Sequence, residues 1–178
     1  KQHHSKKYIN SEEFLSNPLS ALLLLKRFRT DWPAIHAIIK EPTDIQTDFL
    51  ERYKSFSHYS YFPTDEDFVG AVEALMRLKD TYALSFSSIA NGYFNDIFYG
   101  TKLSADDCLE IGKVFYFQED FHNALKWFQQ ASVKLDSATL RIQVDVLDYL
   151  SYCLYRTDDL GGAIKYTRQL LNLDRNHE

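Results

Sequence analysis

The chain has 178 residues and a formal net charge of −5, and hydrophobic residues make up 45% of it. This content suffices for a buried core, and this length allows one compact domain or two small ones. Only 6 glycines and 4 prolines are present, too few for the many turns of an all-β fold, so the composition favours helices. The negative charge argues against a nucleic-acid partner, and no apolar run is long enough to span a membrane.

The N-terminal half is predicted to consist of several short helices. Residues 11–13 have the composition of a helix start, and apolar side chains recur at helical spacing over residues 18–29. The Thr-Asp-Trp-Pro sequence at residues 30–33 predicts an interruption, because proline lacks the backbone donor that a helix interior needs. A second helix is then expected to end near Pro42. Residues 53–62 form an aromatic connector whose rings we expect to cover neighbouring helices.

A better-defined helix is predicted from Thr64 to about Leu84. Thr64 suits the N-cap position, and the three acids after it suit the positive end of the helix dipole. Apolar residues then fall on one side of the helix: Phe68, Ala71, Val72, Leu75 and Leu78. Farther along, residues 91–100 contain two glycines and no clear periodicity, and they are predicted to form a loop.

From Ser104 onward the sequence matches the tetratricopeptide pattern, a helix pair of about 34 residues. Ser104 and the acids after it predict a capped helix start, and Gly112 takes the small-residue position where two helices approach closely. A second copy begins about 39 residues later, which predicts a linker or a longer helix near residues 137–144. In this second copy, Thr167 stands where the pattern usually has an aromatic residue.

These elements predict an all-α fold in two domains. An N-terminal helical region is expected at residues 1–103, followed by tetratricopeptide-like repeats at residues 104–178. Phenylalanine, alanine and leucine take the positions that pack in the second helix of each repeat: Phe121, Ala124, Phe128 and Ala131, then Leu160, Ala163, Leu170 and Leu173.

The helix predicted over residues 145–156 has two different sides. Leucines occupy one side, and three tyrosines and several charges occupy the other. Three residues of the first repeat, Leu109, Lys113 and Tyr116, fall on the matching side, with Asp106 and Phe117 at its margin. In a tetratricopeptide stack this side lines a concave groove. The candidate peptide-binding residues are therefore Lys113, Tyr116, Phe117, Asp148, Tyr149, Tyr152, Tyr155 and Arg156.

A row of tyrosines suits a proline-rich strand in the polyproline II conformation. Such a strand presents apolar proline rings and unpaired carbonyls, and tyrosine offers a ring face to the first and a hydroxyl to the second. The alternative is that these tyrosines pack beneath a third helix. The pattern by itself favours neither arrangement.

Enzymatic and metal-binding functions have little support in the sequence. The six histidines are scattered, and neither a His-x-Asp nor a His-Glu-x-x-His motif occurs. No glycine-rich phosphate loop is present. Cys108 and Cys153 lie on apolar helix faces with no histidine nearby, which favours free, buried thiols over the alternative of a disulfide. No catalytic, cofactor-binding or metal-binding residues are therefore predicted in this chain.

Several motifs resemble the collagen prolyl 4-hydroxylase α subunit. Residues 61–67 (YFPTDED) and 70–82 resemble the N-terminal part of that subunit. Three further motifs resemble that subunit's peptide-substrate-binding domain: residues 103–108 (LSADDC), 112–114 (GKV) and 146–152 (VLDYLSY).

The resemblance, which runs from about Asn17 to the end, implies a procollagen-proline 4-dioxygenase of the endoplasmic-reticulum lumen. The family's catalytic domain, with Fe(II), 2-oxoglutarate and ascorbate (vitamin C), would lie beyond Glu178. The resemblance also implies an α2β2 tetramer, with protein disulfide isomerase as the β subunit and a second α subunit contacted through the N-terminal region. This chain would bind X-Pro-Gly segments of procollagen and present them to the separate catalytic domain.

Two other functions stay open on the sequence. One is a generic tetratricopeptide adaptor that holds another protein's tail, although Asp145 and Asp148 oppose a basic, carboxylate-binding groove. The other is a helical dimerisation module carried by the N-terminal helices. Titration with Pro-Pro-Gly repeats and with acidic C-terminal tails distinguishes substrate binding from the adaptor function.

Overall fold

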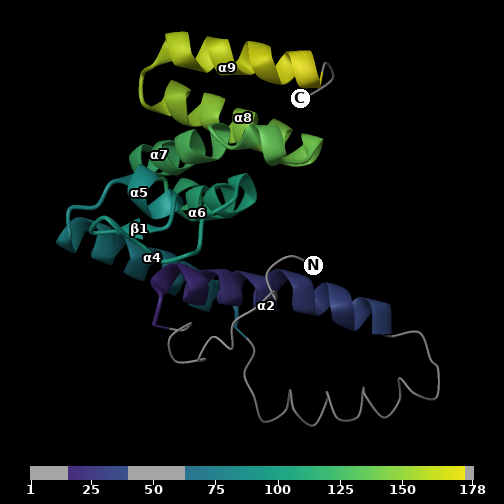
Figure 1. Cartoon of the computed structure of the whole chain (residues 1–178). Coiled ribbons are helices and arrows are strands. Elements are labelled where there is room, and N and C mark those ends of the chain that lie inside the picture. Colours follow the sequence, from purple (N-terminus) through teal and green to yellow (C-terminus); the bar gives the residue numbers. More distant parts are fainter. Residues whose placement is uncertain (1–15, 40–62, 175–178) are drawn as a thin grey trace. The chain divides into compact units, whose positions relative to one another are not determined.

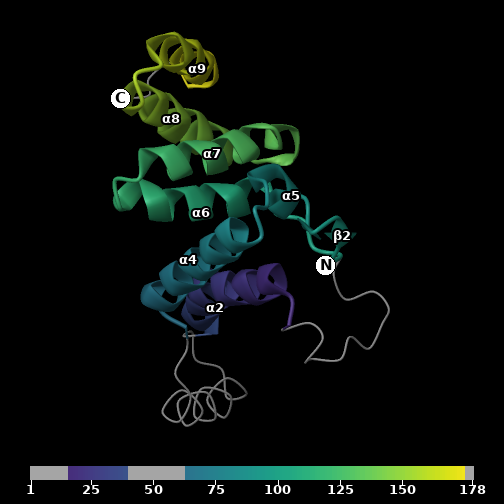
Figure 2. The same ribbon diagram turned by 90° about the vertical axis from the view of Figure 1, so that its left-hand side faces the viewer.

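The computed structural model describes residues 16–39 and 63–174 of the chain. Within these residues the structure is helical apart from one two-stranded sheet, so the predicted all-α class is confirmed (Figures 1 and 2). The chain divides into two compact units, Lys1–Leu75 and Met76–Glu178, and the division falls within helix α4. The domain boundary expected after residue 103 stays a prediction.

Some expectations cannot be compared with the structure. The helix start at residues 11–13, the helix end near Pro42 and the aromatic connector at residues 53–62 lie outside the described residues. Among the helices that are described, none combines the length and the apolar character needed to cross a membrane.

Helix α2, Pro18–Ile39, belongs to the first unit and runs without a break through residues 30–33. The interruption predicted there is therefore wrong. A proline inside a helix removes one backbone hydrogen bond, but the turns on either side keep theirs. The Thr30 hydroxyl also donates to the Lys26 carbonyl at 2.9 Å, which engages a carbonyl of the preceding turn. At the start of α2, the Asn17 side chain accepts from the Leu19 amide at 2.9 Å.

Helix α4, Asp65–Thr81, begins with the predicted cap. The Asp67 carboxylate accepts from the Thr64 amide at 2.7 Å, and the Thr64 hydroxyl accepts from the Asp67 amide at 3.4 Å, which is the reciprocal pattern of a capping box. The hydrogen bond from the Thr64 amide lowers the pKa of the Asp67 carboxyl, and a second one, donated by the Thr64 hydroxyl to the same carboxylate at 2.9 Å, lowers it further. The Phe68 ring is buried with the Arg29 guanidinium 4.6 Å from its centre. The helix ends before Ala83, which has a positive φ of 51°.

The stretch predicted as a loop, residues 91–100, contains a hairpin and follows a short helix. Helix α5, Phe86–Ala90, precedes strands β1, Tyr93–Phe94, and β2, Ile97–Phe98, which pair antiparallel. The loop prediction is therefore wrong for these strands. Their two connecting residues, Asn95 and Asp96, have positive φ angles of 48° and 64°, and asparagine and aspartate tolerate this conformation in two-residue hairpin turns.

The rest of the second unit is a stack of two antiparallel helix pairs. Helices α6, Ala105–Phe117, and α7, Phe121–Ser132, form the first pair. A short 3-10 turn leads to α8, Leu140–Arg156, and α9, Leu160–Leu173, which form the second pair. The four helices follow one another in space in chain order, from teal to yellow in Figure 1. Of the two alternatives predicted near residues 137–144, a linker or a longer helix, the structure has the longer helix, since α8 begins at Leu140.

The two helix pairs turn in the same way. Glu119 and Asp158 have positive φ angles of 61° and 64° at the two turns. The next residue in each case, Asp120 or Asp159, caps the second helix by accepting from a backbone amide, at 3.1 Å and 2.9 Å respectively. This match of turn and cap confirms that the two pairs are copies of one repeat.

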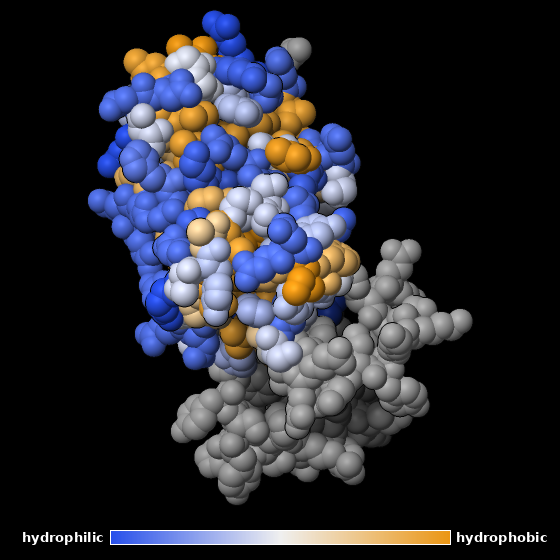
Figure 3. All heavy atoms as spheres, turned by 60° about the vertical axis from the view of Figure 1, so that its left-hand side comes forward, coloured by the Kyte–Doolittle hydropathy of each residue, from blue (hydrophilic) through white to orange (hydrophobic). Residues whose placement is uncertain are grey.

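The first pair packs more tightly than the second. Gly112 lies against the fully buried Phe128 ring, and a Cβ placed on this glycine would meet a ring carbon at 2.7 Å. The predicted close approach is therefore confirmed. In the second pair Ala163 and Leu170 are buried as expected, but Leu160 is 58% exposed and Leu173 is 42% exposed, so packing at these two positions was wrongly predicted. Apolar residues also reach the surface elsewhere, as separate patches among hydrophilic residues on the face in Figure 3.

Candidate peptide-binding face

Six aromatic residues from three successive helices form one continuous set of ring contacts in the second unit. We call this set the aromatic face: Tyr116, Phe117, Phe121, Tyr149, Tyr152 and Tyr155. The first two close α6, the third begins α7, and the three others lie one turn apart along α8. The helix period of 3.6 residues puts positions 149, 152 and 155 on one side.

Tyr116 lies at the centre of the aromatic face. Its ring centre is 4.8 Å from that of Tyr149, 5.6 Å from that of Tyr152 and 5.7 Å from that of Phe121, all in edge-to-face geometry. Such pairs favour well-defined ring positions. Burial raises the pKa of Tyr116, and the neighbouring Tyr152, Cys153, Tyr149 and Asp148 add to the shift. Its hydroxyl therefore keeps its proton, and its capacity to donate, at neutral pH.

The members of the aromatic face differ in exposure. Phe117 is 73% exposed, Tyr155 is 56% exposed and Tyr152 is 40% exposed. Tyr149 is half-buried, because its ring stacks on Phe128 at 5.4 Å between centres. The structure therefore places the outer rings where a ligand can reach them, while Tyr149 also contributes to packing between α7 and α8.

Charged side chains lie at both ends of the aromatic face. The Lys113 ammonium lies 5.5 Å from the centre of the Tyr149 ring and forms a salt bridge of 3.1 Å with Glu110. At the other end, Arg156 donates to the Tyr152 hydroxyl at 3.1 Å. The third charged candidate, Asp148, lines a cleft beside Tyr152. Each of the eight residues predicted from the sequence thus lies beside at least one other of them in this part of the fold.

Phe121 was not predicted as part of this face. The sequence assigned it to helix packing, but it begins α7 directly after the turn and its ring reaches Tyr116 and, at 6.1 Å, Tyr152. No local pattern separates these roles, because the contact joins residues from three helices.

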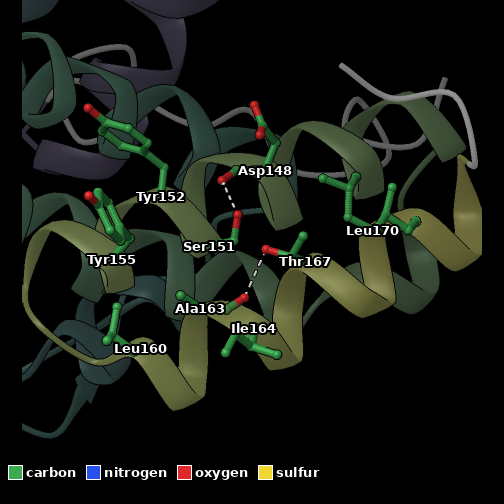
Figure 4. Close-up of a pocket in the computed structure, with 10 residues that line it drawn as sticks. Asp148, Ser151, Tyr152, Tyr155, Leu160, Ala163, Ile164, Thr167 and Leu170 are labelled. Atoms are coloured by element: carbon green, nitrogen blue, oxygen red, sulfur yellow. Dashed lines mark hydrogen bonds between the residues drawn. The ribbon is translucent and has the colours of Figure 1, made fainter.

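A cleft of about 400 Å³ between α8 and α9 was not predicted either. Tyr152 and Tyr155 form part of one wall, and Leu160 and Ile164 form part of the other (Figure 4). Between the two helices, the hydroxyls of Ser151 and Thr167 bond back to carbonyls of their own helices, each at 2.9 Å. Thr167 is the residue that departs from the repeat pattern, which usually has an aromatic residue at this position. An aromatic ring there would fill part of the space that the cleft occupies.

Metal and thiol chemistry have no visible site here. Residues 16–39 and 63–174 contain no group of three or more His, Cys, Asp or Glu side chains that could hold a metal ion. Cys108 and Cys153 are fully buried thiols that form no disulfide, as predicted. Burial raises the pKa of Cys153 to about 12, against a smaller opposite effect of Arg156. A thiol in this state is not a nucleophile at neutral pH.

Two family models match consecutive parts of the chain. The model of the prolyl 4-hydroxylase α-subunit N-terminal region matches residues 1–96. The model of the prolyl 4-hydroxylase peptide-substrate-binding domain matches residues 105–178, which include the whole aromatic face. The chain belongs to the prolyl 4-hydroxylase α-subunit family. Its helix pairs are the tetratricopeptide-like, peptide-substrate-binding domain of that family.

Curated prolyl 4-hydroxylase subunits are similar along nearly all of the chain. Prolyl 4-hydroxylase subunit alpha-1 of Mus musculus is 38% identical over 169 residues, which are 94% of this chain and 31% of the relative. Subunit alpha-2 of Gallus gallus is 35% identical over 176 residues, 98% of the chain and 32% of the relative. Subunit alpha-2 of Caenorhabditis elegans is 34% identical over 171 residues, 93% of the chain and 31% of the relative. The chain thus spans about a third of the length of these relatives.

Proposed function

We propose that residues 105–178 bind a proline-rich strand of the X-Pro-Gly type on the aromatic face and present it for proline 4-hydroxylation. The observation that carries this proposal is the aromatic face itself, a set of packed but partly exposed tyrosines within a domain that matches a peptide-substrate-binding family. The strand is expected to take the polyproline II conformation, in which no backbone hydrogen bonds are made internally.

The arrangement of the rings supports a strand of this kind. Edge-to-face contacts hold the ring of Tyr116 against two tyrosines of α8, so the binding surface is already formed before a ligand arrives. Proline rings can lie on the exposed rings of Tyr152 and Tyr155. Tyrosine hydroxyls can donate to the unpaired carbonyls of the strand.

The rest of the proposed function concerns a longer polypeptide. We propose that hydroxylation takes place in a separate catalytic domain that uses Fe(II), 2-oxoglutarate and ascorbate, since no described residues form a ligand set for iron. We also propose an α2β2 assembly with protein disulfide isomerase in the endoplasmic-reticulum lumen, acting on procollagen. Separating binding from catalysis lets a long repetitive substrate stay tethered while successive prolines react, which raises the effective substrate concentration.

Calorimetric titration of the chain with a Pro-Pro-Gly repeat peptide tests the binding proposal. The repeat peptide is expected to bind, while a peptide of equal length with alanine in place of proline is not. A peptide with an acidic C-terminal tail tests the adaptor alternative in the same experiment. Binding of the acidic tail together with no binding of the proline repeat would overturn the proposed function.

A further inference from the structure

Arg156 ends helix α8 with its guanidinium held on the aromatic face. The central guanidinium carbon is 4.1 Å from the centre of the Phe121 ring, and Nη1 donates to the Tyr152 hydroxyl at 3.1 Å. Tyr152 lies one helical turn earlier, where side chains four residues apart meet. A planar cation held by two contacts is already oriented, so ordering it further on binding costs little. The side chain is nevertheless exposed to solvent.

The positive charge of Arg156 is not compensated at short range. The other cation of the face, Lys113, is paired with Glu110. In the part of the chain that the structure describes, no carboxylate lies within salt-bridge distance of Arg156. Glu119 raises the pKa of Arg156 through its charge, as a smaller cause behind the Tyr152 hydrogen bond, and it forms no ion pair with it. This end of the face therefore offers guanidinium N–H groups beside aromatic rings.

The first repeat has no equivalent charge. In each repeat the first helix, α6 or α8, ends shortly before a turn residue with a positive φ angle. This residue is Glu119 in the first repeat and Asp158 in the second. Counting back from these residues, Phe117 in the first repeat corresponds to Arg156 in the second. An acceptor on a bound strand would therefore meet a cation at Arg156 and an apolar ring at the equivalent position of the first repeat, Phe117.

We propose that Arg156 makes the aromatic face select proline-rich strands that carry an acidic side chain next to proline. This inference rests on the proposed function, because it concerns the same strand. A glutamate at X in X-Pro-Gly presents a carboxylate to the guanidinium while its neighbouring proline rings lie on Phe121 and Tyr152. In polyproline II, X positions recur about every 9 Å. At physiological salt, charges attract one another over a Debye length of about 8 Å, which is close to that interval. In any register of the strand, one X position therefore lies close enough to the Arg156 guanidinium to feel its charge.

The experiment compares Pro-Pro-Gly repeat peptides in which a single X position is glutamate, glutamine or lysine, with that position moved along the peptide. Each peptide is titrated calorimetrically into the wild type, Arg156→Gln and Arg156→Lys. The ratio of the lysine and glutamate dissociation constants is taken for each protein. Any effect of the substitution on ring packing acts on both peptides alike and cancels in this ratio. Arg141→Gln is the matched control, because it removes the same charge from an exposed position about 22 Å away along α8.

In the wild type and in Arg141→Gln, the glutamate peptide is expected to bind roughly two- to fivefold more tightly than the lysine peptide at one X position, and less so at high salt. Arg156→Gln is expected to abolish this preference, and Arg156→Lys to keep part of it. A preference of unchanged size in Arg156→Gln, or no preference at any X position in the wild type, would overturn the inference. In both of those cases binding of the unsubstituted repeat leaves the proposed function standing, whereas its failure to bind overturns both.

Discussion

Tyr116 is the residue whose ring makes the most contacts within the aromatic face. Its ring touches Tyr149 and Tyr152 of α8 and Phe121 of α7, so it connects three helices. Tyr152 combines one contact to this centre with 40% exposure. We expect Tyr116, Tyr149 and Tyr152 to carry most of the peptide affinity, and Tyr155 and Phe117 to contribute less from the margins.

Replacing Tyr152 by alanine is expected to weaken binding of a proline-rich peptide by about 1–3 kcal/mol, because a ring surface and a hydroxyl donor are both lost. Tyr152→Phe is expected to cost less, since only the hydroxyl goes. Calorimetric titration measures the affinities, and a thermal melt of each variant shows that the fold is kept. Tyr82→Ala, which removes a 56% exposed tyrosine outside the face, serves as the control. Unchanged affinity in folded Tyr152→Ala would contradict the assignment of this residue to the site.

The two cysteines give a second prediction at the scale of single residues. Cys108 and Cys153 are fully buried, and burial raises the pKa of Cys153 to about 12. Because the thiolate is the reactive form, the native protein is expected to resist a thiol reagent at about pH 8. Unfolding in guanidinium should expose both thiols and return the pKa of Cys153 to about 8.5, so both should then react quickly. Rapid labelling of the native protein would contradict this burial.

Helix pairs show how far sequence alone can go. The caps at Asp120 and Asp159 depend on residues within one helical turn, so a local sequence pattern is sufficient to specify them. The continuous α2 did not follow from its sequence, since the cost of a proline depends on how much the rest of the helix contributes. Likewise, Phe121 joins the aromatic face through contacts between helices that no local period encodes. Charges and tyrosines of α8 were predicted because they share one helix side.

Glycines of the two repeats offer a matched test of helix packing. Gly112→Ala is expected to lower the free energy of unfolding by about 1–3 kcal/mol, because the added Cβ would overlap the Phe128 ring. Gly161→Ala is expected to raise it by about 0.4–1 kcal/mol, because its nearest neighbour would be 3.7 Å away and alanine restricts the unfolded chain. Urea denaturation measures both changes. Equal effects of the two substitutions would show that the close approach at Gly112 is not tightly packed.

At the scale of the whole chain, two family models match consecutive regions. The residues that the structure describes contain no cluster that could hold iron. The N-terminal model ends at residue 96 and the peptide-substrate-binding model begins at residue 105, so the hairpin of residues 93–98 lies at their junction. The chain covers 31–32% of its curated relatives. We propose that binding of substrate and oxidation of proline reside in different parts of a longer protein.

This division predicts that the chain binds a Pro-Pro-Gly peptide without hydroxylating it. Pure chain is incubated with the peptide, Fe(II), 2-oxoglutarate and ascorbate, and mass spectrometry follows the addition of one oxygen per peptide. No addition is expected, since residues 16–39 and 63–174 contain no suitable cluster of iron ligands. A complete α subunit with its β partner serves as the positive control. Turnover by the pure chain would contradict the assignment of catalysis to another domain.

The cleft between α8 and α9 has a consequence for local opening of the fold. In the first pair the Phe128 ring fills the space against Gly112, whereas Thr167 leaves a cleft of about 400 Å³ in the second pair. Fewer buried apolar contacts lower the free energy of local unfolding, so amide hydrogens of α9 should exchange with deuterium before those of α7. A ligand that binds α8 stabilises only the closed form and should therefore slow exchange in α9 as well. The second repeat carries three of the four tyrosines of the aromatic face. It is thus also the repeat that a bound strand can stabilise most against local unfolding.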